Sequence, residues 1–246
     1  MRYLLYIYIS YIRHLLAALI LAMAGYGTAY GQERVLQHRP YIDLRKFHYG
    51  FFVGGHGQSI KLTTNGFIQS STGRQWFAVN DRYDLGFQVG VLGEWRLTSH
   101  LALRLSPSIY FGNNHIVFRD QPTGDQLIQN MKTSLVTLPI EVKVSAPRFN
   151  NYRPYVIGGI MPSYDLTRRQ QDRLYTKPFN TYITIGAGCD FYLPFFKCIP
   201  ELKFAFGLRD ILERNRPTLI DQSQLIFTES IDRASSSLVM LTLYFE

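Results

Sequence analysis

The chain has 246 residues, of which 46% are hydrophobic, 15% aromatic and 18% charged. This apolar content is ample for a packed core and excludes a disordered chain, while only the N-terminus holds an apolar run long enough to suggest a membrane helix. Lysine and arginine outnumber aspartate and glutamate by 26 to 18, yet no run of them is dense enough to predict a nucleic-acid partner.

The first 31 residues predict a secretory signal peptide. Arg2 and Arg13 are basic, residues 15–24 form an apolar run, and small residues lead to Gly31. This order is typical of a cleaved export signal. An uncleaved membrane anchor is the alternative, because residues 3–12 are also apolar.

From Phe47 onward, apolar residues alternate with polar or small ones. The clearest alternating runs cover residues 85–95, 101–106, 136–145, 183–192, 202–209 and 239–245, and weaker runs cover 47–58 and 152–166. A period of two predicts β-strands with one apolar face, and these runs predict eight of them. No helical pattern of useful length competes with this interpretation.

The predicted connections alternate between short and long. The short ones span residues 96–100, 147–151 and 194–197, and the long, polar ones span 59–82, 115–132, 167–179 and 210–234. This alternation predicts an all-β fold, an eight-stranded antiparallel transmembrane β-barrel built as an up-and-down meander. Short turns would be periplasmic and long loops external, in the bacterial outer membrane. A soluble sandwich or lipocalin-like barrel is the alternative.

An even number of strands would leave both termini in the periplasm. The chain would then have three parts: a signal peptide at 1–31, a periplasmic N-terminal segment at 32–46 and the barrel at 47–246.

Seven charged residues fall on the predicted inner face, all in the periplasmic half of the barrel. They are Glu94, Arg104, Glu141, Lys143, Asp190, Glu201 and Lys203. Four acids and three bases in a narrow interior should pair, because unpaired buried charge is costly. We favour a salt-bridged plug over a proton relay or solute path, since eight strands leave space only for side chains.

No motif predicts catalysis, a cofactor or a metal site. The histidines lack metal-ligand spacing. A lipid hydrolase would need a serine and a histidine in one site, and no histidine shares a plausible site with Ser106 and Ser108. We therefore expect a protein that is not an enzyme.

Two further features remain open. Cys189 and Cys198 flank a short turn and could form a disulfide, or Cys189 could serve as a small hydrophobe on the apolar face. Arg168, Arg169 and Arg173 make one long loop basic, which could meet lipopolysaccharide or a partner or could simply be solvated.

Four stretches carry a family resemblance: His48–Gly54, Leu135–Val142, Tyr155–Gly159 and Leu241–Phe245. With them the chain resembles the PorT/SprT family of the Bacteroidetes, small outer-membrane barrels associated with the type IX secretion system. The resemblance implies a non-enzymatic accessory role in exporting cargo with C-terminal sorting domains and, in gliding species, in motility. Its partners would be outer-membrane lipid, lipopolysaccharide and other type IX secretion components.

One residue departs from the usual barrel ending, because Glu246 follows Phe245 where a terminal aromatic residue is commonest. The alternative function is that of a surface-exposed, adhesin-like or orphan barrel that binds ligands through its long loops.

Overall fold

The computed structural model describes residues 36–67, 76–82, 84–120, 124–167, 175–214 and 230–246. The predicted signal peptide and the three loop arginines at 168, 169 and 173 lie outside these ranges. Within them, Ile42–Leu44 form one turn of 3-10 helix, and no helix is long and apolar enough to cross a membrane.

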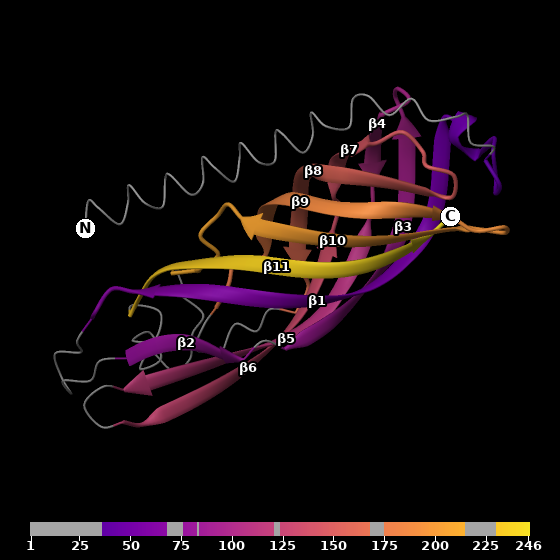
Figure 1. Cartoon of the computed structure of the whole chain (residues 1–246). Coiled ribbons are helices and arrows are strands. Elements are labelled where there is room, and N and C mark those ends of the chain that lie inside the picture. Colours follow the sequence, from indigo (N-terminus) through magenta and orange to yellow (C-terminus); the bar gives the residue numbers. More distant parts are fainter. Residues whose placement is uncertain (1–35, 68–75, 83, 121–123, 168–174, 215–229) are drawn as a thin grey trace, which may run out of the picture. The chain divides into compact units, whose positions relative to one another are not determined.

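Eleven strand segments make up the described fold (Figure 1). They are β1 (Phe47–Thr64), β2 (Trp76–Arg82), β3 (Leu85–Arg96), β4 (Leu101–Leu105), β5 (Ser108–Asp120), β6 (Gln126–Thr137), β7 (Ile140–Ser145), β8 (Tyr152–Asp165), β9 (Phe179–Tyr192), β10 (Lys197–Gly207) and β11 (Ile231–Phe245).

These segments form eight barrel strands, because β2 continues into β3, β4 into β5 and β6 into β7. Proline causes two of the interruptions, since Pro107 and Pro139 have no amide hydrogen to donate to the ladder. The register is the same on both sides of these breaks: Leu105 pairs with Ile140 and Ser108 with Thr137.

The sheet closes on itself. β1 pairs with β3 on one side and with β11 on the other, so the first strand meets the last, and every pairing is antiparallel. The predicted all-β fold, an eight-stranded antiparallel meander, is confirmed.

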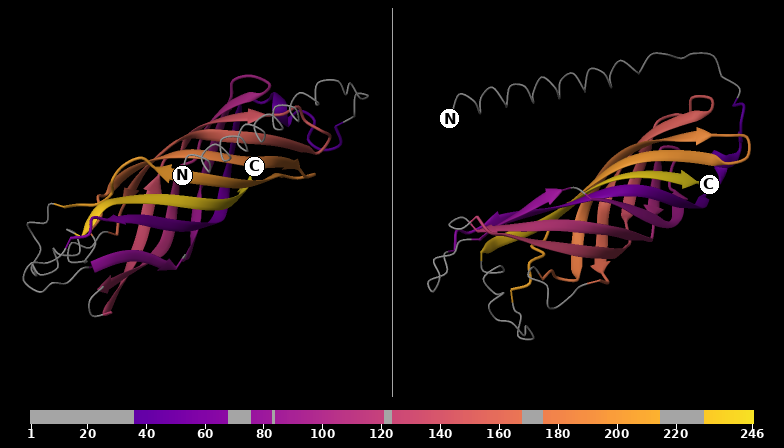
Figure 2. Two further views of the ribbon diagram at one scale, coloured as in Figure 1. Left: turned by 60° about the vertical axis from the view of Figure 1, so that its left-hand side comes forward. Right: turned by 90° about the horizontal axis from the view of Figure 1, so that it is seen from below.

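The strands next to the first two predicted loops are longer than the sequence indicated. β1 runs to Thr64, β2 occupies 76–82, and β5 and β6 cover most of the loop predicted at 115–132. Figure 2 shows these strands reaching past the ends of β8, β9 and β10. Burial explains the extension, because Ile60, Ile116 and Phe118 point inward and are at most 4% exposed.

The polarity of the two faces of the barrel wall is the reverse of that in a soluble protein. Large apolar side chains point outward, as at Leu85 and Leu241, which are 88% and 60% exposed. Charged side chains point inward, as at Arg104 and Glu141, which have no exposed surface. An outward apolar band around a polar interior is typical of a barrel surrounded by lipid.

Candidate functional site

The lumen is layered, and the inward side chains of β11 pass through every layer. Tyr244, near the C-terminus, lies among charged groups, Met240 and Leu238 lie in an apolar layer, Ser236 in a neutral polar layer and Ala234 in a second apolar layer. The charged layer is therefore at the end of the barrel that carries the short turns.

Nine side chains of alternating sign connect through the charged layer. This ion-pair chain runs, in order, through Glu246, Lys197, Asp190, Lys143, Glu94, Arg104, Glu201, Lys203 and Glu141. All seven residues singled out in the sequence belong to it, and Lys197 and Glu246 extend it to the C-terminus.

The contacts at the centre of the ion-pair chain are short. Lys143 lies 2.9 Å from Asp190 and 3.4 Å from Glu94. Arg104 lies 2.7 Å from Glu94 and 2.6 Å from Glu201. Each cation therefore bridges two carboxylates, which compensates for the loss of water around it.

The end of the ion-pair chain at Glu141 also has close contacts. Lys203 lies 2.9 Å from Glu201 and 2.7 Å from Glu141. The hydroxyl of Thr184 donates to Glu141 at 2.7 Å. At 0% exposure, Glu141 is nonetheless contacted by both a cation and a hydroxyl donor.

Tyrosines complete the surroundings of Arg104 and Glu201. The hydroxyls of Tyr155 and Tyr244 donate to Glu201 at 2.6 and 2.9 Å. The Arg104 guanidinium faces the same two rings, 5.1 and 5.0 Å from their centroids. Cation–π contact and charge-assisted hydrogen bonds thus hold the centre of the chain in one geometry.

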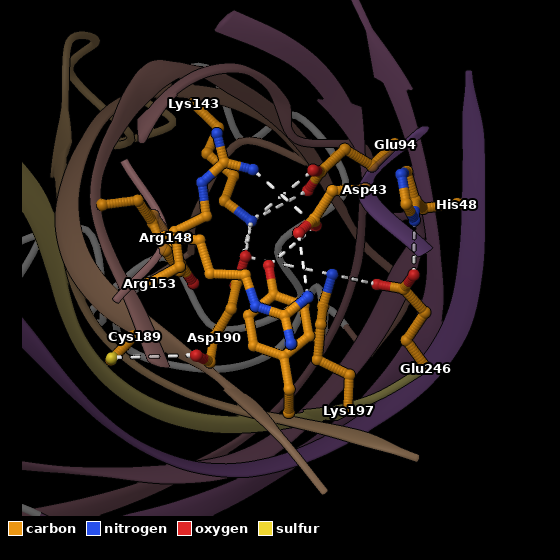
Figure 3. A network of polar contacts seen from close by, with 12 residues as sticks. Asp43, His48, Glu94, Lys143, Arg148, Arg153, Cys189, Asp190, Lys197 and Glu246 are labelled. Carbon is orange, nitrogen blue, oxygen red and sulfur yellow. Dashed lines mark hydrogen bonds and ion pairs between the residues drawn. The ribbon is translucent and has the colours of Figure 1, made fainter. Parts of the chain in front are cut away.

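The N-terminal segment covers the short-turn end of the lumen (Figure 3). Asp43 lies 3.2 Å from Arg148 and 3.8 Å from Arg153, and it accepts a hydrogen bond from Tyr192 at 2.7 Å. The Arg148 guanidinium also stacks 3.5 Å from the centroid of the Tyr192 ring. We call residues 36–46 the cap.

Glu246 links the cap and the ion-pair chain to the seam, the line along which β1 and β11 close the barrel. Its side chain contacts His48 of β1 and Lys197 of β10, and its backbone carbonyl accepts from Arg39 at 3.1 Å. Burial opposes its ionisation, but the hydrogen bond from His48 and the charge of Lys197 lower the pKa of Glu246 from 4.5 to about 2.

Above the ion-pair chain, an apolar layer that we call the septum crosses the lumen. Its members are Tyr110, Leu135, Met161, Tyr182, Ala205, Leu238 and Met240, all at most 5% exposed. Because they come from β5, β6, β8, β9, β10 and β11, these side chains separate the charged layer from the long-loop end.

A neutral polar layer follows the septum. Gln58 donates to Ser236 at 2.9 Å, and Asn114 donates to Gln58 at 3.1 Å and to Thr133 at 3.0 Å. A cavity of about 30 Å³ in this layer has room for a few waters, and one of about 10 Å³ beneath the cap has room for about one.

The long-loop end of the lumen is apolar. Ile211 and Leu212, from the segment after β10, pack against Ile60, Trp76 and other buried side chains of the long strands. The described lumen thus consists of packed layers that leave cavities of water size.

Several members of the site were not predicted. Lys197 falls in the turn predicted at 194–197, yet it is an even number of residues from Glu201 and Lys203 and so shares their face of the strand. Glu246 is likewise two residues from the inward-facing Tyr244. Parity could have revealed both. No local pattern marks Asp43 or its partners Arg148 and Arg153, because folding brings them together from distant segments.

The disulfide considered for Cys189 and Cys198 is not formed in the structure. The register places Cys198 opposite Phe191, so the two cysteines are displaced along the hairpin rather than opposite one another. Cys189 points outward and is partly exposed, as the alternative of a small outward-facing hydrophobe requires.

The serines considered for catalysis face the interior. Ser106 is 1% exposed, and Ser108 contacts Thr137 at 2.8 Å. Across the described ranges, no group of three or more histidine, cysteine or carboxylate side chains is arranged to hold a metal ion.

Comparison with known proteins agrees with this architecture. The family model described as "Outer membrane protein beta-barrel domain" matches residues 31–213. A search of curated proteins returned no match.

Among solved structures, the outer membrane protein OprG from Pseudomonas aeruginosa is 11% identical, covering 81% of this chain and 92% of that one at a TM-score of 0.45. Ail, the attachment invasion locus protein of Yersinia pestis, in complex with the heparin analogue sucrose octasulfate, is 11% identical, covering 82% and 99% at a TM-score of 0.36.

Proposed function

Because the chain belongs to the outer membrane protein β-barrel domain family, we propose that it is a non-conducting outer-membrane barrel that supports type IX protein secretion. In this proposal it is an accessory or assembly component without catalytic activity. It contributes surfaces to the secretion machinery and does not itself carry cargo.

The observation that carries this proposal is the packed lumen. The buried ion-pair chain and the septum lie in series, and the cavities described above are of water size. A folded or extended cargo chain needs a far wider path than this. The protein would therefore act through its loops, its turns, its cap or its lipid-facing wall.

The link to type IX secretion has separate support in the four stretches that resemble the PorT/SprT family. All four lie in the described wall: His48–Gly54 in β1, Leu135–Val142 across β6 and β7, Tyr155–Gly159 in β8, and Leu241–Phe245 in β11, where it pairs with β1 to close the barrel. In the proposed orientation the cap and both ends of the mature chain face the periplasm.

Deleting the gene tests the secretion role. Cargo with C-terminal sorting domains would be quantified by mass spectrometry in the periplasm and in the culture medium. We expect the cargo to be trapped in the periplasm and its release to be restored by the intact gene. The abundance of unrelated outer-membrane proteins is the control for general envelope damage.

Normal cargo release by the deletion strain would refute the secretion role. It would leave the alternative of a surface barrel that binds ligands through its long loops. That alternative predicts that replacing the loops abolishes ligand binding while secretion continues.

A further inference from the structure

A polar patch lies on the outward face of β1 and β11, toward the long-loop end. It consists of four hydroxyl side chains and two cations: Ser59, Lys61, Thr63, Arg233, Ser235 and Ser237. We call it the hydroxyl–cation patch. The residues between them, such as Ile60, Ala234 and Ser236, are at most 4% exposed and point into the lumen. Alternation along a strand therefore directs the patch outward.

The register makes the patch continuous. Ser59 pairs with Ser237, Lys61 with Ser235 and Thr63 with Arg233. Side chains directly opposite each other on antiparallel strands have Cβ atoms only about 5 Å apart. Two cations are thus held diagonally across a pair of strands, with hydroxyl groups between and beside them.

The cations of the patch are not neutralised within the described part of the chain, where no carboxylate forms an ion pair with Lys61 or Arg233. The nearest acid in sequence is Asp232, which is exposed and whose carbonyl accepts from Arg214. The patch therefore presents positive charge and hydrogen-bond donors together, as recognition of a phosphate group requires.

The position of the patch relative to the apolar band indicates which kind of phosphate group it can bind. Along β11 the outward residues toward the C-terminus are apolar and exposed: Val239 at 48%, Leu241 at 60% and Leu243 at 40%. The patch begins two residues beyond Val239, where the apolar band ends. Figure 1 shows β1 and β11 side by side along this part of the wall. Such a boundary is where lipid headgroups meet a barrel.

A furrow in the apolar wall leads up to the patch. Gly57 lies between Leu85 on β3 and Val239 on β11, and Gly55 lies between Phe87 and Leu241. A Cβ atom added at Gly57 would meet nothing within 4 Å, and one added at Gly55 would meet only a carbonyl oxygen at 3.8 Å. The furrow is apolar on both sides and one side chain wide.

We propose that the patch and furrow bind an anionic lipid of the leaflet at the long-loop end. The phosphate lies against Lys61 and Arg233 and accepts hydrogen bonds from the serine hydroxyls, while one acyl chain lies along Gly55 and Gly57. In the proposed orientation this lipid is lipid A, the phosphorylated anchor of lipopolysaccharide. The inference rests on that placement in the membrane and does not depend on the secretion role.

The test uses the purified, detergent-solubilised protein and native mass spectrometry. Three probes are titrated: bisphosphorylated lipid A, enzymatically dephosphorylated lipid A and inorganic phosphate. We expect retention of the bisphosphorylated lipid at least tenfold tighter than that of the dephosphorylated lipid. Inorganic phosphate should not bind measurably at the same concentrations.

Variants locate the site. Lys61→Glu combined with Arg233→Glu should weaken lipid A binding at least tenfold, whereas Lys132→Glu, an exposed cation on β6 away from the patch, should change it less than twofold. Ser235→Ala combined with Ser237→Ala should weaken it about threefold and provides a second test should the charge reversals impair folding.

Equal binding of the two lipids, or unchanged affinity in the folded patch variants, would overturn the proposal. Binding of inorganic phosphate as tight as that of the lipid would also overturn it, in favour of a free-anion site. All of these readouts come from purified protein, so failure of the secretion role in cells would leave them unaffected.

Discussion

At the scale of single residues, the ion-pair chain depends on each charge having partners on both sides. Lys143 bridges Glu94 and Asp190, and Glu141 holds the end of the chain through Lys203. Removing one member leaves a buried charge without its partner, which is more damaging than removing a whole pair. We therefore expect that replacing either an acidic or a basic member of the ion-pair chain destabilises the folded barrel.

Replacing Glu141 or Lys143 with Ala should lower the free energy of unfolding by about 3–5 kcal/mol. Thermal unfolding of the purified barrel, followed by circular dichroism, measures this as a lower Tm. Lys132→Ala, at an exposed position, is the matched control and should leave the Tm unchanged. An unchanged Tm in both lumen variants would refute the salt-bridged plug.

The lowered pKa of Glu246 predicts that the folded barrel loses stability at acid pH. Its pKa is lowered from 4.5 to about 2 in the folded chain, so its contribution to stability is present above pH 4.5 and is lost as the pH falls toward 2. A shift of this size corresponds to about 3 kcal/mol.

Glu246→Gln removes this titration while keeping the shape of the side chain. The difference in stability between wild type and variant should therefore be largest near neutral pH and should shrink between pH 4.5 and pH 2. Thermal unfolding at a series of pH values measures it. A difference that stays constant over this range would show that the ionised carboxylate contributes nothing.

At the scale of elements, the seam between β1 and β11 combines close inner packing with an open outer face. A Cβ atom added at Gly50 would lie 2.1 Å from the carbonyl oxygen of Phe245, closer than any real contact, whereas Gly57 has open space outside. The two glycines lie in the same strand, so they form a matched pair.

Gly50→Ala should destabilise the barrel by roughly 1–3 kcal/mol, because the seam must shift to admit the methyl group. Gly57→Ala should have little effect on stability. Comparing the urea midpoints of the two variants in the same detergent tests this difference. Equal midpoints would contradict the packing described at the seam.

Much of this element structure could be predicted from the sequence, for physical reasons. A period of two identifies both the strand and its inward face, and the order of short and long connections assigns each charge to one end of the barrel. That was enough to bring Glu94, Arg104 and Glu201 to one place. The elongated β5 and β6 were not predicted, because beyond the apolar band most of their outward residues are polar, such as Asn113, Asn130 and Lys132.

The cap could not be predicted in the same way. Asp43 precedes the first strand, whereas Arg148 lies in a turn far along the chain, and neither has a periodic neighbour that assigns it to a face. Only closure of the barrel brings them to within 3.2 Å. Contacts that depend on tertiary structure alone leave no local pattern in a single sequence.

At the scale of the whole molecule, the barrel is sealed by barriers of different chemistry placed in series. The cap covers the short-turn end, the ion-pair chain fills the next layer, and the septum follows. The proposed roles in secretion and lipid binding are both compatible with this seal, because they use the outside of the barrel.

The central claim is that the lumen does not conduct, and reconstitution in a planar lipid bilayer tests it most directly. An open porin inserted in the same bilayer serves as the positive control. With the purified protein inserted, we predict a current no greater than that of the bare bilayer at every voltage applied. Reproducible single-channel steps from the wild-type barrel would contradict the claim and would mean that ions cross both the ion-pair chain and the septum.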